Sequence, residues 1–143
     1  MSLADRKIVF LFPGQGAQYE NMGSELIENN PVYAAAKEVL SEEVFEVIRE
    51  GKKEALEKTK YCQPAIFLNS LALYFEFKKA ITGYDMADGT DVDAVFKSPL
   101  SDVPAAMIGL SLGEYTALCA GGKISLSQAI ELVNTRGNIM SKG

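Results

Sequence analysis

The sequence of 143 residues predicts an α/β fold with a parallel sheet. Two short runs, KIVFLF (7–12) and VPAAMIG (103–109), are continuously apolar after the first lysine, which is typical of strands buried on both faces of a parallel sheet. Helical patterns follow each run, so the predicted order is strand, helices, strand, helices. Two central strands do not make a stable parallel sheet by themselves, so we expect the chain to be part of a larger domain.

After the first strand, the chain predicts a tight loop and two short helices. The proline and the two glycines of PGQGAQ (13–18) force the loop. The first helix begins at Pro31, because Asn30 can cap it and proline suits the first helical position. The second helix runs from Ser41 to a glycine stop at Gly51.

The longest periodic segment, 62–83, predicts a helix in the middle of the chain. Pro64 fits its first turn and Gly83 its C-terminal end. Apolar residues cover nearly the whole circumference from Ala65 to Phe77. Such a helix is buried inside a larger structure and does not lie on its surface.

The second half of the chain predicts a loop, a strand and two helices. The stretch 84–102 is acidic and rich in turn residues, which predicts a loop excursion. The strand 103–109 follows, and then a helix over 112–122 that ends at its two glycines. The last helix, 125–142, begins with the capping-box spacing of its first serine and Gln128.

Composition and charge limit the classes of partner. The net charge is −5 and the basic residues are scattered, which argues against nucleic acid and against an anionic membrane surface. No apolar run reaches the ~20 residues that span a bilayer.

Cys62 and Cys119 lie in apolar stretches and are expected to be buried free thiols. Since the chain has no histidine, we expect no metal site; the expected compartment is the cytoplasm.

The residues 109–113, GLSLG, form a G-x-S-x-G motif between a predicted strand and a predicted helix. This is the setting of a nucleophile elbow, where glycines permit a strained turn that exposes the serine. Ser111 is therefore a candidate nucleophile, and the N–H of Leu112 is a candidate oxyanion donor. The motif alone is a weak signal, because a plain glycine-rich turn matches it equally well.

Two further positions have both a functional and a structural interpretation. The backbone N–H of Gln15 can be a second oxyanion donor, or its loop can be a simple turn. Arg136 lies on one stripe of the last helix with Ala129, Val133 and Met140, and a buried arginine needs an anionic partner. That partner is either one of the 19 acidic residues or a substrate carboxylate bound by two parallel hydrogen bonds.

Five segments in order, FLFPGQGAQ, MGSEL, CQPAIFLNSLALY, GLSLGEYTAL and RGNIM, resemble malonyl-CoA:acyl-carrier-protein transacylases and the acyltransferase domains of polyketide and fatty-acid synthases. The resemblance implies that 1–143 is a partial acyltransferase domain. It corresponds to the N-terminal part of the large, α/β-hydrolase-like subdomain, without the ferredoxin-like small subdomain. The implied reaction, in fatty-acid or polyketide synthesis, transfers malonyl from coenzyme A to acyl carrier protein through a serine acyl-enzyme, with no cofactor.

The resemblance also assigns roles to single residues. By resemblance Ser111 is the nucleophile, and the backbone N–H groups of Gln15 and Leu112 form the oxyanion hole. Arg136 holds the malonyl carboxylate. Gln63 lines the pocket, although its position near the start of a helix can also be purely structural.

This sequence departs from the family pattern in two places. The family has a histidine before the serine, where this chain has Leu110, and the exchange changes the hydrogen bonding and shape beside the nucleophile. The family's catalytic histidine lies far downstream, beyond the small subdomain. The resemblance therefore implies that the base is outside this chain, and that the chain alone is a truncated, inactive portion. Independently, the two central-type strands and the all-round apolar helix predict that the chain self-associates through uncovered edges and apolar patches. The stretch 84–102 is also longer than the usual family connection.

Two other functions stay open on the sequence. A lipid acyl hydrolase with a Ser-Asp dyad shares the G-x-S-x-G motif, although no aspartate here has a recognisable dyad context. A non-catalytic chain that pairs with another protein would fit Leu110 and the absence of histidine, but not the retained Ser111 and Arg136.

Overall fold

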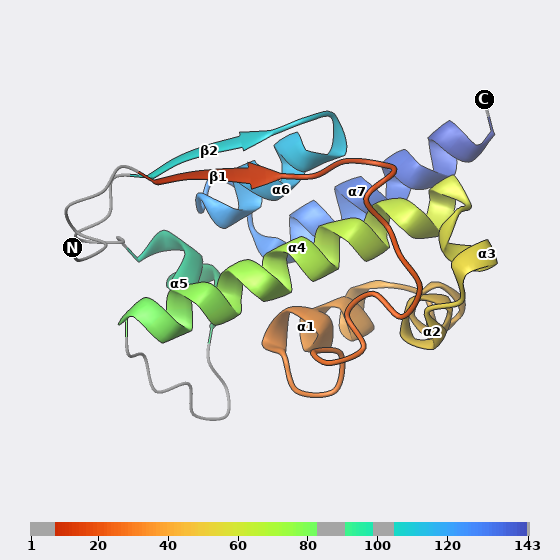
Figure 1. The fold of residues 1–143 in the computed structure, drawn as a ribbon, viewed down its shortest axis with the longest axis horizontal. Coiled ribbons are helices and arrows are strands. Elements are labelled where there is room, and N and C mark those ends of the chain that lie inside the picture. Colours follow the sequence, from red (N-terminus) through yellow and green to blue (C-terminus); the bar gives the residue numbers. More distant parts are fainter. Residues whose placement is uncertain (1–7, 83–90, 99–104, 143) are drawn as a thin grey trace.

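A computed structural model describes residues 8–82, 91–98 and 105–142 of the chain (Figure 1). The described residues form a mixed α/β structure that is mostly helical, with a two-stranded parallel sheet. In chain order the elements are β1 (Ile8–Phe12), α1 (Pro31–Val39), α2 (Glu42–Glu50), α3 (Lys53–Leu56), α4 (Thr59–Thr82), α5 (Val92–Lys97), β2 (Ala105–Gly109), α6 (Leu112–Ala120) and α7 (Leu126–Ser141).

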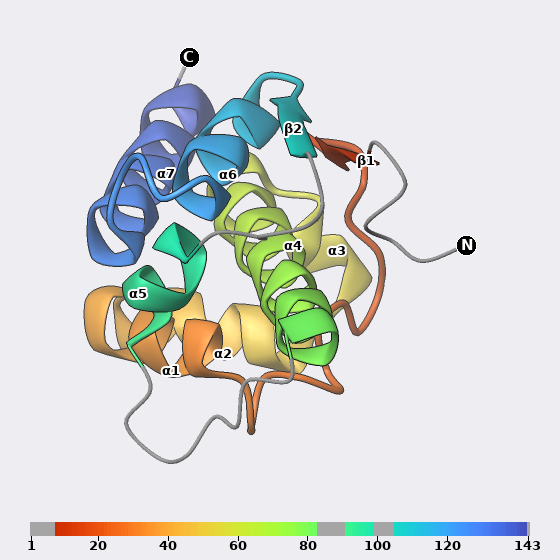
Figure 2. The ribbon, with the colours of Figure 1, turned by 90° about the vertical axis from the view of Figure 1, so that its left-hand side faces the viewer.

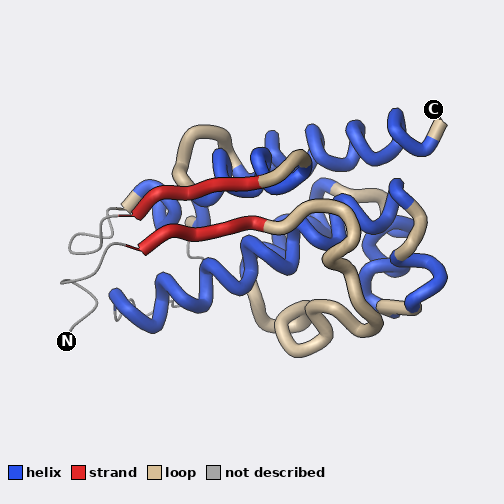
Figure 3. Tube along the Cα trace, turned by 45° about the horizontal axis from the view of Figure 1, so that its top comes forward, coloured by secondary structure: helices blue, strands red, loops and turns tan. Residues whose placement is uncertain are grey.

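The two strands pair in parallel, with Ile8 opposite Ala105 and Phe12 opposite Gly109. Both predicted strands are confirmed. Because they run in the same direction, the loops that leave them start at the same end of the sheet (Figure 3). The register therefore brings the PGQGAQ loop and the GLSLG turn together, although about a hundred residues separate them in the sequence.

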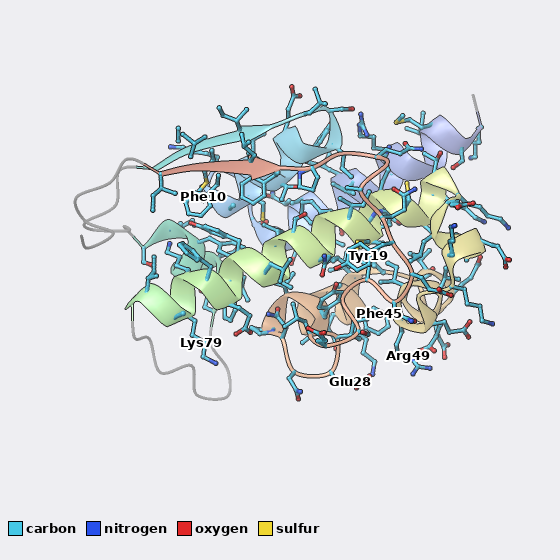
Figure 4. All side chains as sticks on the ribbon, viewed as in Figure 1. Phe10, Tyr19, Glu28, Phe45, Arg49 and Lys79 are labelled. Atoms are coloured by element: carbon cyan, nitrogen blue, oxygen red, sulfur yellow. The ribbon has the colours of Figure 1, made fainter. Side chains whose placement is uncertain are left out.

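The expectation that both strands are buried on both faces is wrong for the described structure. Side chains alternate along the strands, and the outward ones are open to solvent: Leu11 is 73% exposed and Ile108 is 55% exposed. Figure 2 shows the helices on one side of the sheet only. On the inner side, Phe10 points toward α4 and makes edge contacts with Tyr74 and Phe77 (Figure 4).

Helix α4 crosses the middle of the molecule, with the sheet on one side and α1 and α2 on the other (Figures 1 and 2). It begins at Thr59, before the predicted start, so Pro64 lies inside the helix and not in its first turn. The predicted burial between Ala65 and Phe77 holds for most positions, but Leu73 faces solvent. The predicted stop at Gly83 lies outside the described residues.

The helix starts around α4 follow the capping signals in the sequence. Asn30 accepts a hydrogen bond from the Val32 N–H at 2.9 Å and donates to the Ala72 carbonyl of α4 at 3.2 Å. Ser41 caps α2, and the predicted capping box at the start of α7 is formed. Helix α3 was not predicted, because it has only four residues and no side-chain cap.

The predicted loop excursion 84–102 contains helix α5, which corrects the sequence-based expectation for 92–97. Asp91 caps this helix, and the buried Lys78 of α4 donates to the carbonyl of Ser98 at its other end, at 2.6 Å. Burial lowers the pKa of Lys78. Asp93 accepts from the N–H of Leu126 at 2.8 Å, which fixes α5 to the start of α7. Residues 84–90 and 99–102 of the excursion lie outside the described residues.

Candidate active site

The GLSLG turn is a sharp corner between β2 and α6 that presents Ser111 to solvent. Ser111 has φ 56° and ψ −109°, a conformation that a residue with a side chain rarely adopts. Such strain persists only where the surrounding structure holds the residue in place, and it is concentrated at functional sites. The strained turn favours the interpretation of the motif as a nucleophile elbow over that of an ordinary turn.

The two outer glycines of the motif are required by close backbone contacts. A Cβ on Gly109 would overlap the carbonyl of Gly113, and a Cβ on Gly113 would overlap the carbonyl of Phe12. The second contact joins the elbow to the end of β1. The G-x-S-x-G spacing is therefore a steric requirement of packing this corner against the neighbouring strand.

The loop after β1 lies directly against the elbow. A Cβ on Gly14 would be 2.7 Å from the carbonyl oxygen of Leu110 and 3.9 Å from the N atom of Leu112. Leu112 is the first residue of α6, so its N–H has no acceptor inside the helix. Gln15 follows Gly14 directly. The structure thus brings both predicted oxyanion donors to the same end of the sheet.

Arg136 of α7 points at Ser111. Its Nη2 donates to Ser111 Oγ at 2.8 Å, and its Nη1 donates to Gln63 Oε1 at 2.7 Å. The guanidinium lies over the ring of Tyr115, with 5.6 Å from its central carbon to the ring centroid. No acidic side chain of the described residues forms an ion pair with Arg136, so the structural ion pair considered from the sequence is not found there.

The predicted apolar stripe around Arg136 is only partly correct. Ala129 and Val133 are fully buried, as expected, but Met140 is 46% exposed and Arg136 itself is half-buried. Arg136, Met140 and Tyr115 line an open groove of about 790 Å³ between α6 and α7. The charged end of Arg136 therefore lies at the border between the buried interior and this groove.

Gln63 connects Arg136 to the loop after β1. It is completely buried in α4, and its Nε2 lies 3.2 Å from Met140 Sδ and 3.5 Å from Gln15 Oε1. The Gln15 side chain in turn donates to Thr59 Oγ1 at 3.2 Å. A continuous set of polar contacts thus runs from the first turn of α4 through Arg136 to Ser111.

The sequence interpretation missed Tyr115 and Thr59. Tyr115 lies four residues after Ser111, so helical spacing from the motif could have placed it beside the nucleophile. Thr59 gave no such signal, because the predicted helix began after it.

The described site holds no group that can act as a general base on Ser111. The 143 residues include no histidine, and the side-chain hydrogen bond found at Ser111 comes from Arg136. The cysteines are buried free thiols, as predicted. Burial raises the pKa of Cys62 to about 11, and burial together with the charge of Asp93 raises the pKa of Cys119 to about 12. Both thiols therefore stay protonated near neutral pH.

Neither a metal site nor a membrane span is found in the part of the chain that the structure describes. Within it, histidine, cysteine and acidic side chains do not gather in groups of three or more that could hold a metal ion. None of its helices combines the length and the apolar character needed to cross a bilayer.

Comparison with known proteins finds relatives that agree with one another in family. Residues 9–84 match the family described as "Acyl transferase domain". The chain is 35% identical over 140 residues to the malonyl CoA-acyl carrier protein transacylase of Bacillus subtilis, and 31% identical to that of Escherichia coli. These alignments cover 95% of this chain but 38% and 39% of the relatives. The chain is thus homologous to these transacylases along most of its length and spans about two fifths of theirs.

Solved structures agree with this relationship. An acyl carrier protein S-malonyltransferase from Vibrio cholerae is 33% identical, with a TM-score of 0.70 over 96% of this chain and 40% of that one. A malonyl-transacylase solved in complex with a type II PKS acyl-carrier protein is 32% identical, with a TM-score of 0.70 and the same coverage. The described fold therefore matches one part of these larger proteins.

Proposed function

Because the chain belongs to the acyl transferase domain family, we propose that it carries the nucleophile and the carboxylate-binding residue of a malonyl-CoA:acyl-carrier-protein transacylase. Ser111 Oγ attacks the thioester carbonyl of malonyl-CoA and coenzyme A leaves as its thiol. The thiol of the acyl carrier protein then attacks the acyl-serine and regenerates Ser111. The coenzyme A thioester is the substrate, and the reaction needs no further cofactor.

The observation that carries the proposal is the position of Arg136. A guanidinium is charged at any physiological pH, and this one has no acidic partner among the described residues while it contacts the nucleophile. In a malonyl group one methylene separates the carboxylate from the reacting carbonyl. A guanidinium 2.8 Å from Ser111 Oγ is therefore close enough to bind that carboxylate while the carbonyl lies over the serine.

The neighbouring residues complete this assignment. The N–H groups of Leu112 and Gln15 are proposed to stabilise the oxyanion of the tetrahedral intermediate. Gln63 is proposed to orient Arg136 through the 2.7 Å hydrogen bond and to line the acyl pocket. No hydrogen bond joins Ser111 to an aspartate in the described structure, so no observation favours a Ser-Asp hydrolase.

The base is proposed to come from outside these 143 residues, which contain no histidine. We assign residues 1–143 to the N-terminal part of an α/β-hydrolase-like large subdomain, with 84–102 as an excursion from it. The exposed outer face of the two-stranded sheet, with Leu11 and Ile108, is proposed to pack against the rest of that domain or against a second chain. A cytoplasmic location stays a prediction.

A chimera tests the proposal. This chain is joined to the part of the Bacillus subtilis relative that it does not cover, and transfer from malonyl-CoA to acyl carrier protein is measured. We expect transfer that disappears in Ser111→Ala. Hydrolysis of simple esters without transfer to the carrier protein would contradict the proposal. A folded chimera inactive in both assays would favour a non-catalytic partner chain.

A further inference from the structure

Besides its proposed role as the ligand of the substrate carboxylate, Arg136 donates a hydrogen bond to the proposed nucleophile, Ser111. We propose that Arg136 holds the Ser111 hydroxyl through this hydrogen bond and releases it when a carboxylate binds, so that the carboxylate of the acyl group frees the nucleophile. The inference rests on the proposed function, since it concerns the same pocket. It makes the Ser111–Arg136 contact a determinant of acyl specificity.

The guanidinium is fixed at one end and open at the other. Its Nη1 is bonded to Gln63, which is completely buried, and its face lies against the ring of Tyr115. Its Nη2 reaches Ser111, which is exposed to solvent. An incoming anion therefore meets the guanidinium from the Nη2 side, where the serine hydroxyl is the group already bound.

The contact leaves no room for an acyl group. Arg136 Nη2 and Ser111 Oγ are 2.8 Å apart, too close for any atom of a ligand to lie between them. A malonyl group that binds Nη2 through its carboxylate and presents its carbonyl to Oγ therefore has to take the place of the hydroxyl at Nη2. The hydrogen bond from Arg136 to Ser111 breaks in that exchange.

A carboxylate can replace the Ser111 hydroxyl as the acceptor of the hydrogen bond from Arg136 Nη2. A hydrogen bond from a guanidinium to a carboxylate is charged on both sides, and such bonds are roughly twice as strong as neutral ones. The carboxylate therefore displaces the neutral hydroxyl from Nη2. An acyl group without a carboxylate, such as acetyl, must break the same hydrogen bond and offers Arg136 no charged acceptor in place of the hydroxyl.

Binding measurements on the 143-residue chain test this exchange without any catalysis. The probe is monomethyl malonate, which has the carboxylate and the carbonyl of a malonyl thioester, and methyl acetate is the control ligand without a carboxylate. Removal of the hydroxyl in Ser111→Ala removes the competitor for Nη2. We expect monomethyl malonate to bind Ser111→Ala about fivefold more tightly than wild type, the factor for one ordinary hydrogen bond.

Matched variants keep the result interpretable. Ser127→Ala deletes a hydroxyl on the exposed first turn of α7 and should bind the probe like wild type. Ser111→Gly lacks the hydroxyl too and tolerates the φ of 56° without strain, so it replaces Ser111→Ala if that variant does not fold. Arg136→Ala should lose binding of monomethyl malonate. Methyl acetate should bind none of these proteins measurably.

The outcomes separate the two proposals. Tighter binding by both Ser111 variants, with loss of binding in Arg136→Ala, supports the exchange. Equal or weaker binding by the Ser111 variants, with Arg136→Ala still defective, overturns the exchange and leaves the carboxylate pocket in place. Unchanged binding in Arg136→Ala overturns both, because Arg136 would then not be the carboxylate ligand.

Discussion

Replacement of Arg136 by alanine in the catalytically complete chimera should reduce malonyl transfer far more than acetyl transfer. The malonyl carboxylate can accept two hydrogen bonds from the guanidinium, whereas acetyl has no group to place there. Arg136 also contacts Ser111 at 2.8 Å, so its loss frees the hydroxyl for either substrate. The variant therefore separates binding of the carboxylate from a general effect on the fold.

The structure gives the size of the effect. A hydrogen bond to a charged group is worth about 1.5–3 kcal/mol, and the half-buried position of Arg136 favours the lower end of that range. Two such bonds correspond to about 3 kcal/mol, close to a hundredfold in kcat/KM for malonyl-CoA. For acetyl-CoA we expect no loss and a gain of up to about fivefold, because no ligand charge is left unpaired and Arg136 no longer holds the hydroxyl.

The assay measures kcat/KM for malonyl-CoA and acetyl-CoA with acyl carrier protein as acceptor. Arg136→Lys keeps the charge but cannot form the planar fork, so its malonyl activity should lie between those of wild type and Arg136→Ala. Lys142→Ala removes a cation from the end of α7 and serves as the matched control. Equal losses for both acyl donors in Arg136→Ala would refute the reasoning and make Arg136 a structural residue.

Four further outcomes follow from the described structure. The 143-residue chain alone should show no malonyl transfer above the rate without protein, because a serine without a base is a weak nucleophile; steady-state turnover at ordinary enzymatic rates would contradict this. Gly113→Ala should lower the free energy of unfolding by about 2 kcal/mol or more in thermal denaturation, since its Cβ overlaps backbone; an unchanged midpoint would mean that the corner can relax. Light scattering should show self-association that Leu11→Lys reduces, and a monomer at high concentration would argue that the outer sheet face needs no cover. The free energy of unfolding should fall as the pH rises from about 9 toward 11, because the buried thiols of Cys62 and Cys119 keep protons that the unfolded chain releases; Cys62→Ala should lessen this slope in chemical denaturation, and an unchanged slope would show that Cys62 does not cause it.

Local sequence signals predicted most of the fold. Asn30, Ser41 and Ser125 start helices where their capping side chains led us to expect them, because a cap is a short-range contact that the sequence carries in full. The two strands could be located because their apolar runs are also local signals. Their burial could not be predicted, because the exposure of Leu11 depends on whether another element covers that face, and this is not encoded within the strand.

The errors in the helices have local causes. Pro64 predicts a helix start, yet the helix begins five residues earlier, at Thr59, and tolerates the missing N–H of the proline. The sequence predicts a loop where helix α5 forms, because its six residues lie among turn residues and acidic side chains. Its stability comes from tertiary contacts with Lys78 and Leu126, which no local pattern reveals.

The roles of the site residues stay predictions, but their contacts are visible in the structure. The resemblance names Ser111, Arg136 and Gln63, and the guanidinium of Arg136 donates to both Ser111 and Gln63. Helical spacing alone put Arg136 on an apolar stripe and offered two possible partners for it. That its guanidinium donates a hydrogen bond to Ser111 could be seen only in three dimensions.

The most direct test of the central claim is the mass of the acyl-enzyme. The chimera is incubated with malonyl-CoA without acyl carrier protein, stopped rapidly and analysed by intact mass and peptide mapping. We predict one malonyl group on the peptide that contains Ser111, no such adduct in Ser111→Ala, and loss of the adduct when carrier protein is added before the stop. A malonyl adduct on another residue, or malonyl transfer that persists in Ser111→Ala, would contradict the assignment of Ser111 as the nucleophile.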